Sequence, residues 1–396
     1  MKILYSAIDQ VVPGTTGGSV HVAAVAEGLA ALGHEVVALV TAGAGLEASR
    51  EVRWISLPPP LGSTHLRLAR TRAIERLARA ERPDVVIERY HNFGGDAIRV
   101  ARSVGAVAVL EVNAPVVDFP GSRKALLDRA LLVQPMRRWR ERLVSLADVI
   151  VTPDAAILPD GTPREKIAVL EWGADTHAFR PGAGDAPFER PPANTLAVFA
   201  GAFRSWHGAI TLVRAIRTLE HRGRGDIGAV MIGRGPEWDA AREAAEGSPL
   251  VQFTNAIPHA NMPGALAHAD IGVAPFDVAA HGPLSLGFYW SPLKMFEYMA
   301  AGLPVVAPAV DRIPSLVGHE REGLLYDPSI PDALADALAR LADDPLLRSR
   351  LGAAARERAV REYSWTAHCK ALETKMLAKI GKDRKIKIMR SKDQRP

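Results

Sequence analysis

The chain has 396 residues, of which 48% are apolar and 23% are charged, as is typical of a globular protein with a large buried core. This length predicts two or three domains. The single cysteine, Cys369, excludes an internal disulfide framework and suits a reducing cytoplasm, and no apolar run approaches the roughly 18 residues of a membrane span. The net charge of +5 equals the charge of residues 381–396 alone, so the rest of the chain is about neutral.

The first half of the chain alternates strands and helices, the rhythm of a doubly wound parallel sheet. Short apolar runs predict strands at residues 2–8, 34–40, 84–88, 107–112 and 148–152. Helical periodicity predicts helices at residues 19–32, 66–80, 95–104 and 123–146, the last of them long and basic.

The rhythm restarts after residues 180–194, which are rich in Pro and Gly and predict a linker. Strands are expected at residues 196–201, 226–233, 251–253, 271–275, 304–307 and 323–326. Helices are expected at residues 208–222, 237–246, 261–268, 292–301, 331–343 and 345–362.

The predicted fold class is therefore α/β, with two Rossmann-like doubly wound domains that face a central cleft. We assign residues 1–180 to the N-terminal domain and residues 181–364 to the C-terminal domain. We expect a C-terminal helix at residues 365–380 to pack back on the N-terminal domain, and the basic tail at residues 381–396 to be disordered.

The most informative stretch is Ser291-Pro-Leu-Lys-Met-Phe-Glu-Tyr-Met-Ala-Ala-Gly-Leu-Pro-Val-Val306. It predicts a helix with Ser291 as its N-cap and Pro292 in its first turn, closed by Gly302 and followed by a buried strand. The amides at a helix N-terminus favour phosphate, and Glu297, about one turn further on, could accept hydrogen bonds from sugar hydroxyls. The stretch predicts half of a nucleotide site.

A second candidate segment of the C-terminal domain, Gly201-Ala-Phe-Arg-Ser-Trp-His-Gly208, joins a strand to a helix. It places Arg204 and His207 at the carboxyl end of a strand, where ligands of open α/β sheets bind and where cations would neutralise a leaving diphosphate. Arg204 alone could instead be a surface residue. The turn with Gly233 and Gly235 could line the same site, although two such glycines are a weak signal.

The candidate residues of the N-terminal domain lie in three loops. Gly17 and Gly18 belong to a glycine-rich turn before the first helix, where Ser19 could be the cap and His21 could reach a ligand. An ordinary tight turn and a structural histidine are the alternatives. The runs Glu88–His91 and Glu111–Pro115, the second with Glu111 and Asn113, end predicted strands and are either functional or salt-bridged scaffolding.

The sequence contains no HExxH, CxxC or Walker A motif, so we expect no metal and no cofactor. We also expect a cytoplasmic protein with no nucleic-acid partner; the sequence does not set the oligomeric state. The basic segments 137–142 and 382–395 suggest peripheral contact with a membrane, against the alternative of a solvated helix face and a solvated tail.

Together these motifs resemble those of the family 4 glycosyltransferases, retaining enzymes with the GT-B fold. The resemblance covers nearly the whole chain. It rests on Gly17-Gly18, Glu171-Trp-Gly-Ala-Asp175, Phe179-Arg-Pro181, Gly233-Arg-Gly-Pro236 and, most specifically, the stretch from Ser291 to Val306.

The resemblance implies transfer of a sugar from a nucleotide diphosphate sugar to an acceptor hydroxyl, with retention and without a metal. Glu297 would hold the ribose, and the amides near Pro292, Leu293 and Lys294 would hold the diphosphate. Positive charge would come from the catalytic candidates Arg204, His207 and Lys294. The acceptor would lie near Gly17, Gly18, His21, Glu111 and Asn113.

The chain departs from the family pattern at several positions. Tyr289 replaces the first of two glutamates, Ala202 and His207 replace an Arg and a Lys, and Asn113 falls near the place of a histidine. We keep Tyr289 among the expected donor-site residues. Two alternatives remain: a nucleotide-sugar epimerase of the same architecture, and a non-catalytic nucleotide-sugar binder. The stretch from Ser291 favours transfer over epimerisation, whereas only an activity measurement separates an enzyme from a binder.

Overall fold

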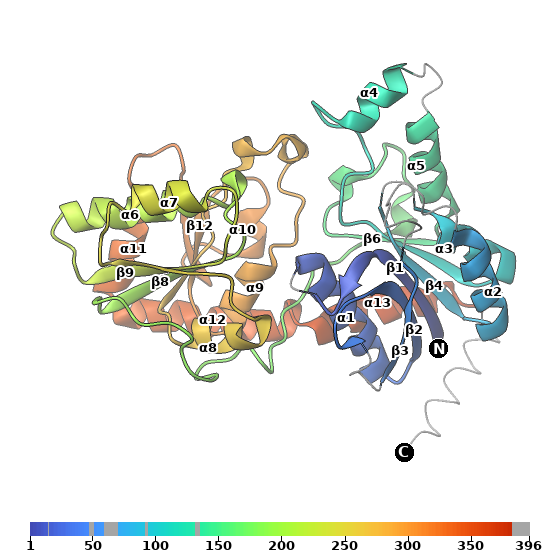
Figure 1. Cartoon of the computed structure of the whole chain (residues 1–396), viewed down its shortest axis with the longest axis horizontal. Coiled ribbons are helices and arrows are strands. Elements are labelled where there is room, and N and C mark those ends of the chain that lie inside the picture. Colours follow the sequence, from blue (N-terminus) through green and yellow to red (C-terminus); the bar gives the residue numbers. More distant parts are fainter. Residues whose placement is uncertain (15, 47–50, 59–69, 92–93, 131–134, 382–396) are drawn as a thin grey trace. The chain divides into compact units, whose positions relative to one another are not determined.

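In the computed structural model the chain divides into two compact units (Figure 1). Unit 1 comprises residues 1–172 and the chain from Trp365 onward, and unit 2 comprises residues 173–364. The structure describes all residues except 15, 47–50, 59–69, 92–93, 131–134 and 382–396. The predicted tail therefore lies almost wholly outside the described residues.

Unit 2 begins before the Pro- and Gly-rich segment in which we expected the domain boundary. The amide of Ala174 donates to the carbonyl of Tyr363 at 2.7 Å. Arg356 donates to the carbonyl oxygens of Thr176 and Phe179 at 2.8 and 2.7 Å. These bonds attach the segment that follows Trp172 to unit 2.

The described part of unit 1 forms a seven-stranded parallel sheet in the order β3-β2-β1-β4-β5-β6-β7. Its strands are β1 Lys2–Val12, β2 Glu35–Ala42, β3 Val52–Ser56, β4 Val85–Arg89, β5 Val107–Glu111, β6 Val149–Thr152 and β7 Ile167–Val169. Its helices are α1 Gly17–Ala31, α2 Thr71–Glu81, α3 Asp96–Val104, α4 Arg123–Ala130, α5 Pro135–Leu146 and α13 Trp365–Lys379. Helices α1 and α13 lie on one side of the sheet, and α2, α3 and α5 lie on the other (Figure 1).

Two helix predictions for unit 1 were wrong in detail. The helix expected at residues 123–146 is two helices, and the second begins at Pro135, because proline lacks the amide that a helix interior requires. Helix α1 begins two residues earlier than expected. Its cap is Thr16, whose hydroxyl accepts from the amide of Ser19 at 3.2 Å, so Ser19 is not the cap.

The C-terminal helix α13 packs on α1 in unit 1. The sulfur of Cys369 lies 3.8 Å from the carbonyl of Val25 and is fully buried. Gly28 of α1 lies so near this sulfur that an added Cβ would be only 2.6 Å from it. The cysteine is therefore a packing residue of this helix contact.

The described part of unit 2 forms a six-stranded parallel sheet in the order β10-β9-β8-β11-β12-β13. Its strands are β8 Thr195–Ala200, β9 Ile227–Ile232, β10 Val251–Thr254, β11 Ile271–Val273, β12 Val305–Pro308 and β13 Gly323–Tyr326. Its helices are α6 Ala209–His221, α7 Trp238–Ala244, α8 Met262–Ala267, α9 Leu293–Ala300, α10 Ile313–Leu316, α11 Ala333–Asp343 and α12 Pro345–Glu362. Every residue of β8, β9 and β12 is buried because helices cover both faces of the sheet.

Each sheet reverses its strand order at one point, between β1 and β4 in unit 1 and between β8 and β11 in unit 2. Open α/β sheets bind ligands at the carboxyl ends of the strands beside this switch point. The loops that follow β1, β4, β8 and β11 are therefore where a site is expected. The doubly wound α/β prediction is confirmed for both units. None of the helices in the described residues is long and apolar enough to cross a membrane.

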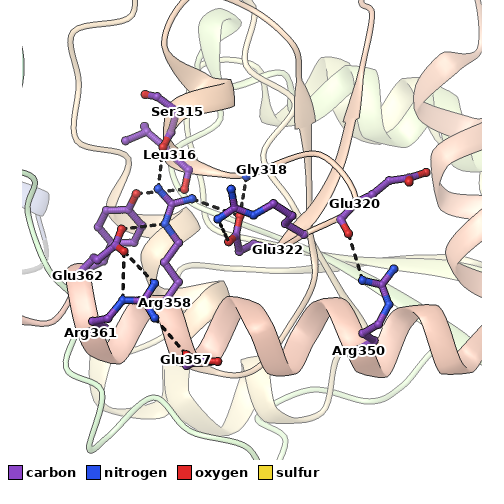
Figure 2. Close-up of polar contacts among 12 residues, drawn as sticks. Ser315, Leu316, Gly318, Glu320, Glu322, Arg350, Glu357, Arg358, Arg361 and Glu362 are labelled. Carbon is purple, nitrogen blue, oxygen red and sulfur yellow. Dashed lines mark hydrogen bonds and ion pairs between the residues drawn. The ribbon is translucent and has the colours of Figure 1, made fainter.

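A buried ion pair connects helix α12 to α10 and to the segment that joins α10 to β13 (Figure 2). Arg358 of α12 contacts the carboxylate of Glu322 at 3.2 Å and donates to the carbonyl of Ser315 at 2.8 Å. Glu322, which is 4% exposed, also accepts from the amide of Gly318 at 2.7 Å. This network fixes the connection between the last two strands of the sheet.

Candidate functional site

The loop after β8 lies at the switch point of unit 2 and turns sharply at Gly201. Gly201 has a φ of +144°, which a residue with a side chain rarely adopts. A Cβ at this position would lie 2.9 Å from the Nζ atom of Lys294 and 3.8 Å from the Nδ1 atom of His207. Two predicted site residues therefore lie beside Gly201: His207 from the turn after β8 and Lys294 from α9, which follows β11.

The ammonium group of Lys294 is buried and has no hydrogen-bond partner among the described residues. It lies 4.3 Å from the ring centre of Phe199 at the end of β8 and 5.4 Å from that of Phe276 after β11. Burial lowers the pKa of Lys294 to about 7, although nearby Glu297 opposes the shift. A buried ammonium without an acceptor is costly, and an anion beside it would remove that cost.

His207 follows Gly201 by one tight turn, and its tautomer is set by a backbone contact. Its Nδ1 atom lies 2.6 Å from the carbonyl oxygen of Ala202, so Nδ1 carries the proton and donates. Burial, followed by the charge of Lys294, lowers the pKa of His207 to about 3. The ring is neutral near pH 7 and presents a lone pair at Nε2. The expected positive charge at His207 is therefore absent from the structure.

Arg204 lies at the exposed end of the same loop, and its guanidinium carbon lies 5.2 Å from the ring centre of Trp206. Trp206 stacks on His281 with ring centres 3.9 Å apart, and Trp290 lies 5.5 Å from His281. The sequence prediction did not anticipate this aromatic group. It places a ring of Trp206 beside the exposed guanidinium of Arg204.

Helix α9 starts one residue later than predicted. Pro292 is the N-cap: its carbonyl accepts from the amides of Met295 and Phe296 at 2.8 and 3.4 Å, and no side chain caps the helix. The prediction that Ser291 caps α9 was wrong; its carbonyl instead accepts from the amide of Leu293 at 3.0 Å. The amide of Lys294 belongs to the first turn of α9, whose N–H groups have no acceptor within the helix itself.

Glu297 is only 7% exposed and is paired with a residue that the sequence prediction missed. The Nε2 atom of His259 lies 3.1 Å from Oε1 of Glu297. This hydrogen bond and the charge of Glu297 raise the pKa of His259, although burial opposes the shift. The ring of Phe179, from the segment that resembled the family's Phe-x-Pro, lies 5.6 Å from that of His259.

The glycines of the Gly233–Pro236 turn are required by packing. A side chain at Gly233 would collide with the carbonyl oxygen of Gly201, and one at Gly235 would lie 2.6 Å from the backbone of Phe203. The loops after β8 and β9 thus touch backbone to backbone. The structure brings Gly233 and Gly235 beside the candidate site, where their demonstrable role is this close packing.

Tyr289 replaces the first family glutamate with a buried neutral ring. It is 3% exposed, its amide donates to the carbonyl of Gly287 at 2.9 Å, and its ring lies 5.7 Å from that of Trp290. Burial raises the pKa of Tyr289 to about 12. Position 289 therefore supplies no carboxylate and remains uncharged at neutral pH.

Of the five residues predicted for the acceptor side, Gly17, Gly18 and His21 lie on α1, directly after β1 at the switch point of unit 1, and Glu111 and Asn113 lie at the carboxyl end of β5. His21, in the first turns of α1, donates from Nε2 to Glu111 at 2.5 Å, and the hydroxyl of Tyr5 donates to the same carboxylate at 2.8 Å. Burial opposes the charge on Glu111, but these donors outweigh it and lower the pKa of Glu111 to about 2. His21 is fully buried, as the alternative of a structural histidine expects.

A tryptophan links this buried pair to the remaining acceptor-side residues. Trp172 lies with its ring 4.5 Å from that of His21 and donates from Nε1 to Oδ1 of Asn113 at 2.9 Å. Gly17 lies beside the same indole, since an added Cβ would be 3.6 Å from it. The Nδ2 donor of Asn113 is buried and has no partner among the described residues.

The described residues include one group of side chains that could hold a metal ion. Its potential ligand atoms, from His21, Glu111 and His368, lie within 4.8 Å of one another. His368 donates from Nδ1 to the carbonyl of Glu171 at 2.7 Å. Burial lowers the pKa of His368 to about 3. Glu111 accepts from His21 and Tyr5, whereas His368 of α13 meets the ring of His21 edge to face at 5.7 Å, so ring packing connects α13 to this hydrogen-bonded pair.

Arg89 is a cation that the residues predicted for the acceptor side did not include. It lies 3.7 Å from Asp9, at the carboxyl end of β1, and 4.0 Å from Glu111. A Cβ at Gly18 would lie 3.3 Å from its Nη2 atom. The neighbouring Glu88 has a structural role instead: it accepts from the amides of Gly95 and Ile98 at 2.6 and 2.8 Å. In the run Glu88–His91, Glu88 therefore supports the backbone before α3, and Arg89 pairs with carboxylates near the carboxyl ends of β1 and β5.

The arginine-rich segment 137–142 is only partly exposed. Arg140 is 3% exposed and donates to Asp118 at 2.8 Å, and Trp139 donates to the carbonyl of Gly94 at 2.9 Å. Arg137 pairs with Glu141 at 2.8 Å on the exposed side. The second basic segment, 382–395, lies outside the described residues.

Comparison with protein families identifies both units. Residues 15–178 match the model of Glycosyltransferase Family 4, and residues 194–344 match the model of Glycosyl transferases group 1. Together the two models cover most of the chain. The chain belongs to glycosyltransferase family 4. The resemblance inferred from the sequence motifs is thereby confirmed.

Relatives within the family share moderate identity. A D-inositol 3-phosphate glycosyltransferase of Corynebacterium glutamicum is 30% identical over 251 residues, which are 58% of this chain and 57% of that protein. The match thus spans less than two thirds of the relative's length. Its activity and substrates are considered below only as proposals for this chain.

Solved structures confirm the GT-B fold. Sucrose-phosphate synthase of Thermosynechococcus elongatus aligns with a TM-score of 0.70 and 19% identity over 95% of this chain and 98% of that one. A Listeria monocytogenes protein whose suggested activity is UDP-N-acetylglucosamine 2-epimerase aligns with a TM-score of 0.60 and 16% identity over 93% and 94%. At such identities the likeness shows the fold alone, and the fold serves more than one reaction.

Proposed function

We propose that this chain transfers a sugar from a nucleotide diphosphate sugar to an acceptor hydroxyl, with retention of anomeric configuration. The observation that carries the proposal is the buried ammonium of Lys294, which has no hydrogen-bond partner among the described residues. It lies at the switch point of the unit that matches Glycosyl transferases group 1, beside the N-terminus of α9. A diphosphate is an anion that suits such a position.

In this proposal, different residues of unit 2 bind the diphosphate, the ribose and the sugar of the donor. Lys294, Arg204 and the α9 amides neutralise the diphosphate, on which negative charge grows as the bond to the sugar breaks. Glu297 accepts hydrogen bonds from the ribose hydroxyls. His207 takes a different part from the one expected, because a neutral ring whose Nε2 carries a lone pair accepts a hydrogen bond from a sugar hydroxyl.

The acceptor hydroxyl is proposed to bind on unit 1. The groups proposed to contact it are the first residues of α1, Gly17 and Gly18, and the partly buried Asn113, whose Oδ1 accepts from Trp172. The buried His21–Glu111 pair keeps this arrangement fixed. D-inositol 3-phosphate, named for the Corynebacterium relative, is one acceptor to test.

The epimerase alternative is kept because a protein with that suggested activity shares the fold. The binder alternative is kept because Tyr289 supplies no carboxylate where family members carry one. Both predict nucleotide binding by unit 2. They differ from the proposed function in the product: an epimerised donor in the first case and an unchanged donor in the second.

The proposal is tested by titrating UDP, GDP and their sugars into the wild-type protein and into Glu297→Gln. Loss of the carboxylate should weaken nucleotide binding by about tenfold or more, as expected for a charged group that accepts ribose hydrogen bonds. Glu243→Gln, on the exposed face of α7, is the matched control and should bind like the wild type. Unchanged binding by Glu297→Gln would remove the ribose assignment.

A further inference from the structure

The carboxylate of Glu297 is held by a side chain from a distant part of the sequence. His259 stands in the short turn His259–Asn261 between β10 and α8, and its Nε2 atom lies 3.1 Å from Oε1 of Glu297 on α9. The side chain of Glu297 is 9% exposed, whereas that of His259 is 41% exposed. The partly exposed His259 thus forms a hydrogen bond with the buried carboxylate of Glu297.

His259 also has an aromatic neighbour and feels the charge of a second carboxylate. The ring of Phe179, which is 1% exposed, meets it edge to face at 5.6 Å. The charge of Asp175 adds to that of Glu297 in favouring the protonated ring. Asp175 in turn accepts from the amides of His177 and Ala178 at 3.0 and 3.1 Å, so the position of this carboxylate is fixed as well.

We propose that His259 is the positioning residue of Glu297: it donates to Oε1 and so aims the remaining lone pairs of the carboxylate at the two ribose hydroxyls of the nucleotide. This inference rests on the proposed function. A glutamate has three side-chain torsions to fix, and a donor that fixes them in advance spares the nucleotide that entropic cost on binding. His259 acts through Glu297 and requires no contact with the nucleotide.

Three substitutions separate hydrogen bonding by His259 from packing. His259→Phe keeps an aromatic ring against Phe179 but removes the donor. His259→Gln places an amide donor near the position of Nε2 without the ring. Glu297→Gln supplies the background for a double-mutant cycle, which measures whether one residue acts through the other. Thermal denaturation of each variant verifies that unit 2 remains folded.

The probes are UDP and GDP and their 2′,3′-dideoxy forms, titrated calorimetrically. We expect His259→Phe to weaken binding of the preferred diphosphate by about five- to tenfold. It should leave the dideoxy form unchanged and cause no further loss in the Glu297→Gln background. His259→Gln should recover most of the affinity.

Two results would overturn the assignment of His259. Wild-type affinity in His259→Phe would show that Glu297 needs no partner. Equal losses for the ribose and dideoxy forms would show that His259 supports the site as a whole. A different result, in which the wild-type protein binds none of the nucleotides or their sugars, would refute the proposed function, and the role of His259 would fall with it.

Discussion

The lowered pKa of Lys294 predicts that nucleotide affinity depends on pH. Burial lowers the pKa of its ammonium group to about 7. A diphosphate beside Nζ favours the charged form and raises this pKa in the complex. The contribution of Lys294 to binding is therefore fully present below about pH 7 and is lost as the pH rises toward the higher pKa of the complex.

The size of the effect follows from the fraction of charged lysine. With a pKa of about 7, this fraction falls from about one half at about pH 7 to about 3% at about pH 8.5. The dissociation constant should rise by about 15-fold over that interval, which is about 1.6 kcal/mol. Nucleotide sugars are the appropriate probes because their diphosphate esters do not titrate in this range.

The assay is a calorimetric titration at several pH values with two control variants. Lys294→Arg stays charged throughout, so its affinity should not change with pH. Lys294→Met is neutral and similar in length, so it should bind more weakly at low pH and show no pH dependence. Because it removes a buried unpaired cation, Lys294→Met should also raise the melting temperature.

Two outcomes would refute this reasoning. If Lys294→Met bound nucleotide sugars as tightly as the wild type near pH 7, Lys294 would have no part in holding the diphosphate. If the wild type were independent of pH while Lys294→Met bound weakly, the ammonium would be charged at every pH tested. The burial argument for its lowered pKa would then be wrong.

The remaining predictions concern one sugar contact, one charge and one structural ion pair. His207→Ala should weaken binding of a nucleotide sugar by about tenfold while leaving the nucleoside diphosphate within about twofold; equal losses for both would return His207 to a phosphate role. Arg204→Ala should mainly lower turnover, and full turnover would exclude it from charge stabilisation. Glu322→Gln, which breaks a buried pair with Arg358, should destabilise unit 2 by about 3 kcal/mol in denaturant unfolding. Glu357→Gln, in an exposed pair on the same helix, should cost less than about 0.5 kcal/mol, and similar losses for the two variants would contradict the role of burial.

The sequence predicted the architecture because apolar runs and helical periods are local signals. The runs that form β8 and β9 are wholly buried, and such continuous apolar runs can be recognised from the local sequence without knowledge of the neighbouring strands. The short edge strands β3 and β7 were missed. Only two of the eight residues they comprise are buried, so their apolar pattern is weak. The split at Pro135 could have been predicted from the proline.

The sequence located the candidate residues but gave little about their chemical state. Glu297, Lys294 and His207 were placed in the site by motif, yet burial decides that Lys294 titrates near neutrality and that His207 is uncharged. The pairing of Glu297 with His259 joins residues 38 positions apart, on elements that meet only in the folded sheet. No local pattern encodes such a contact.

The central claim, sugar transfer from a nucleotide donor, is tested most directly by mass spectrometry of the reaction products. The wild-type protein is incubated with UDP- and GDP-sugars and a panel of hydroxyl acceptors that includes D-inositol 3-phosphate. We predict release of the nucleoside diphosphate together with an acceptor heavier by one sugar, and loss of both in Lys294→Met. Donor that is recovered as its epimer, or bound by the protein but unchanged with every acceptor, would contradict the proposed function.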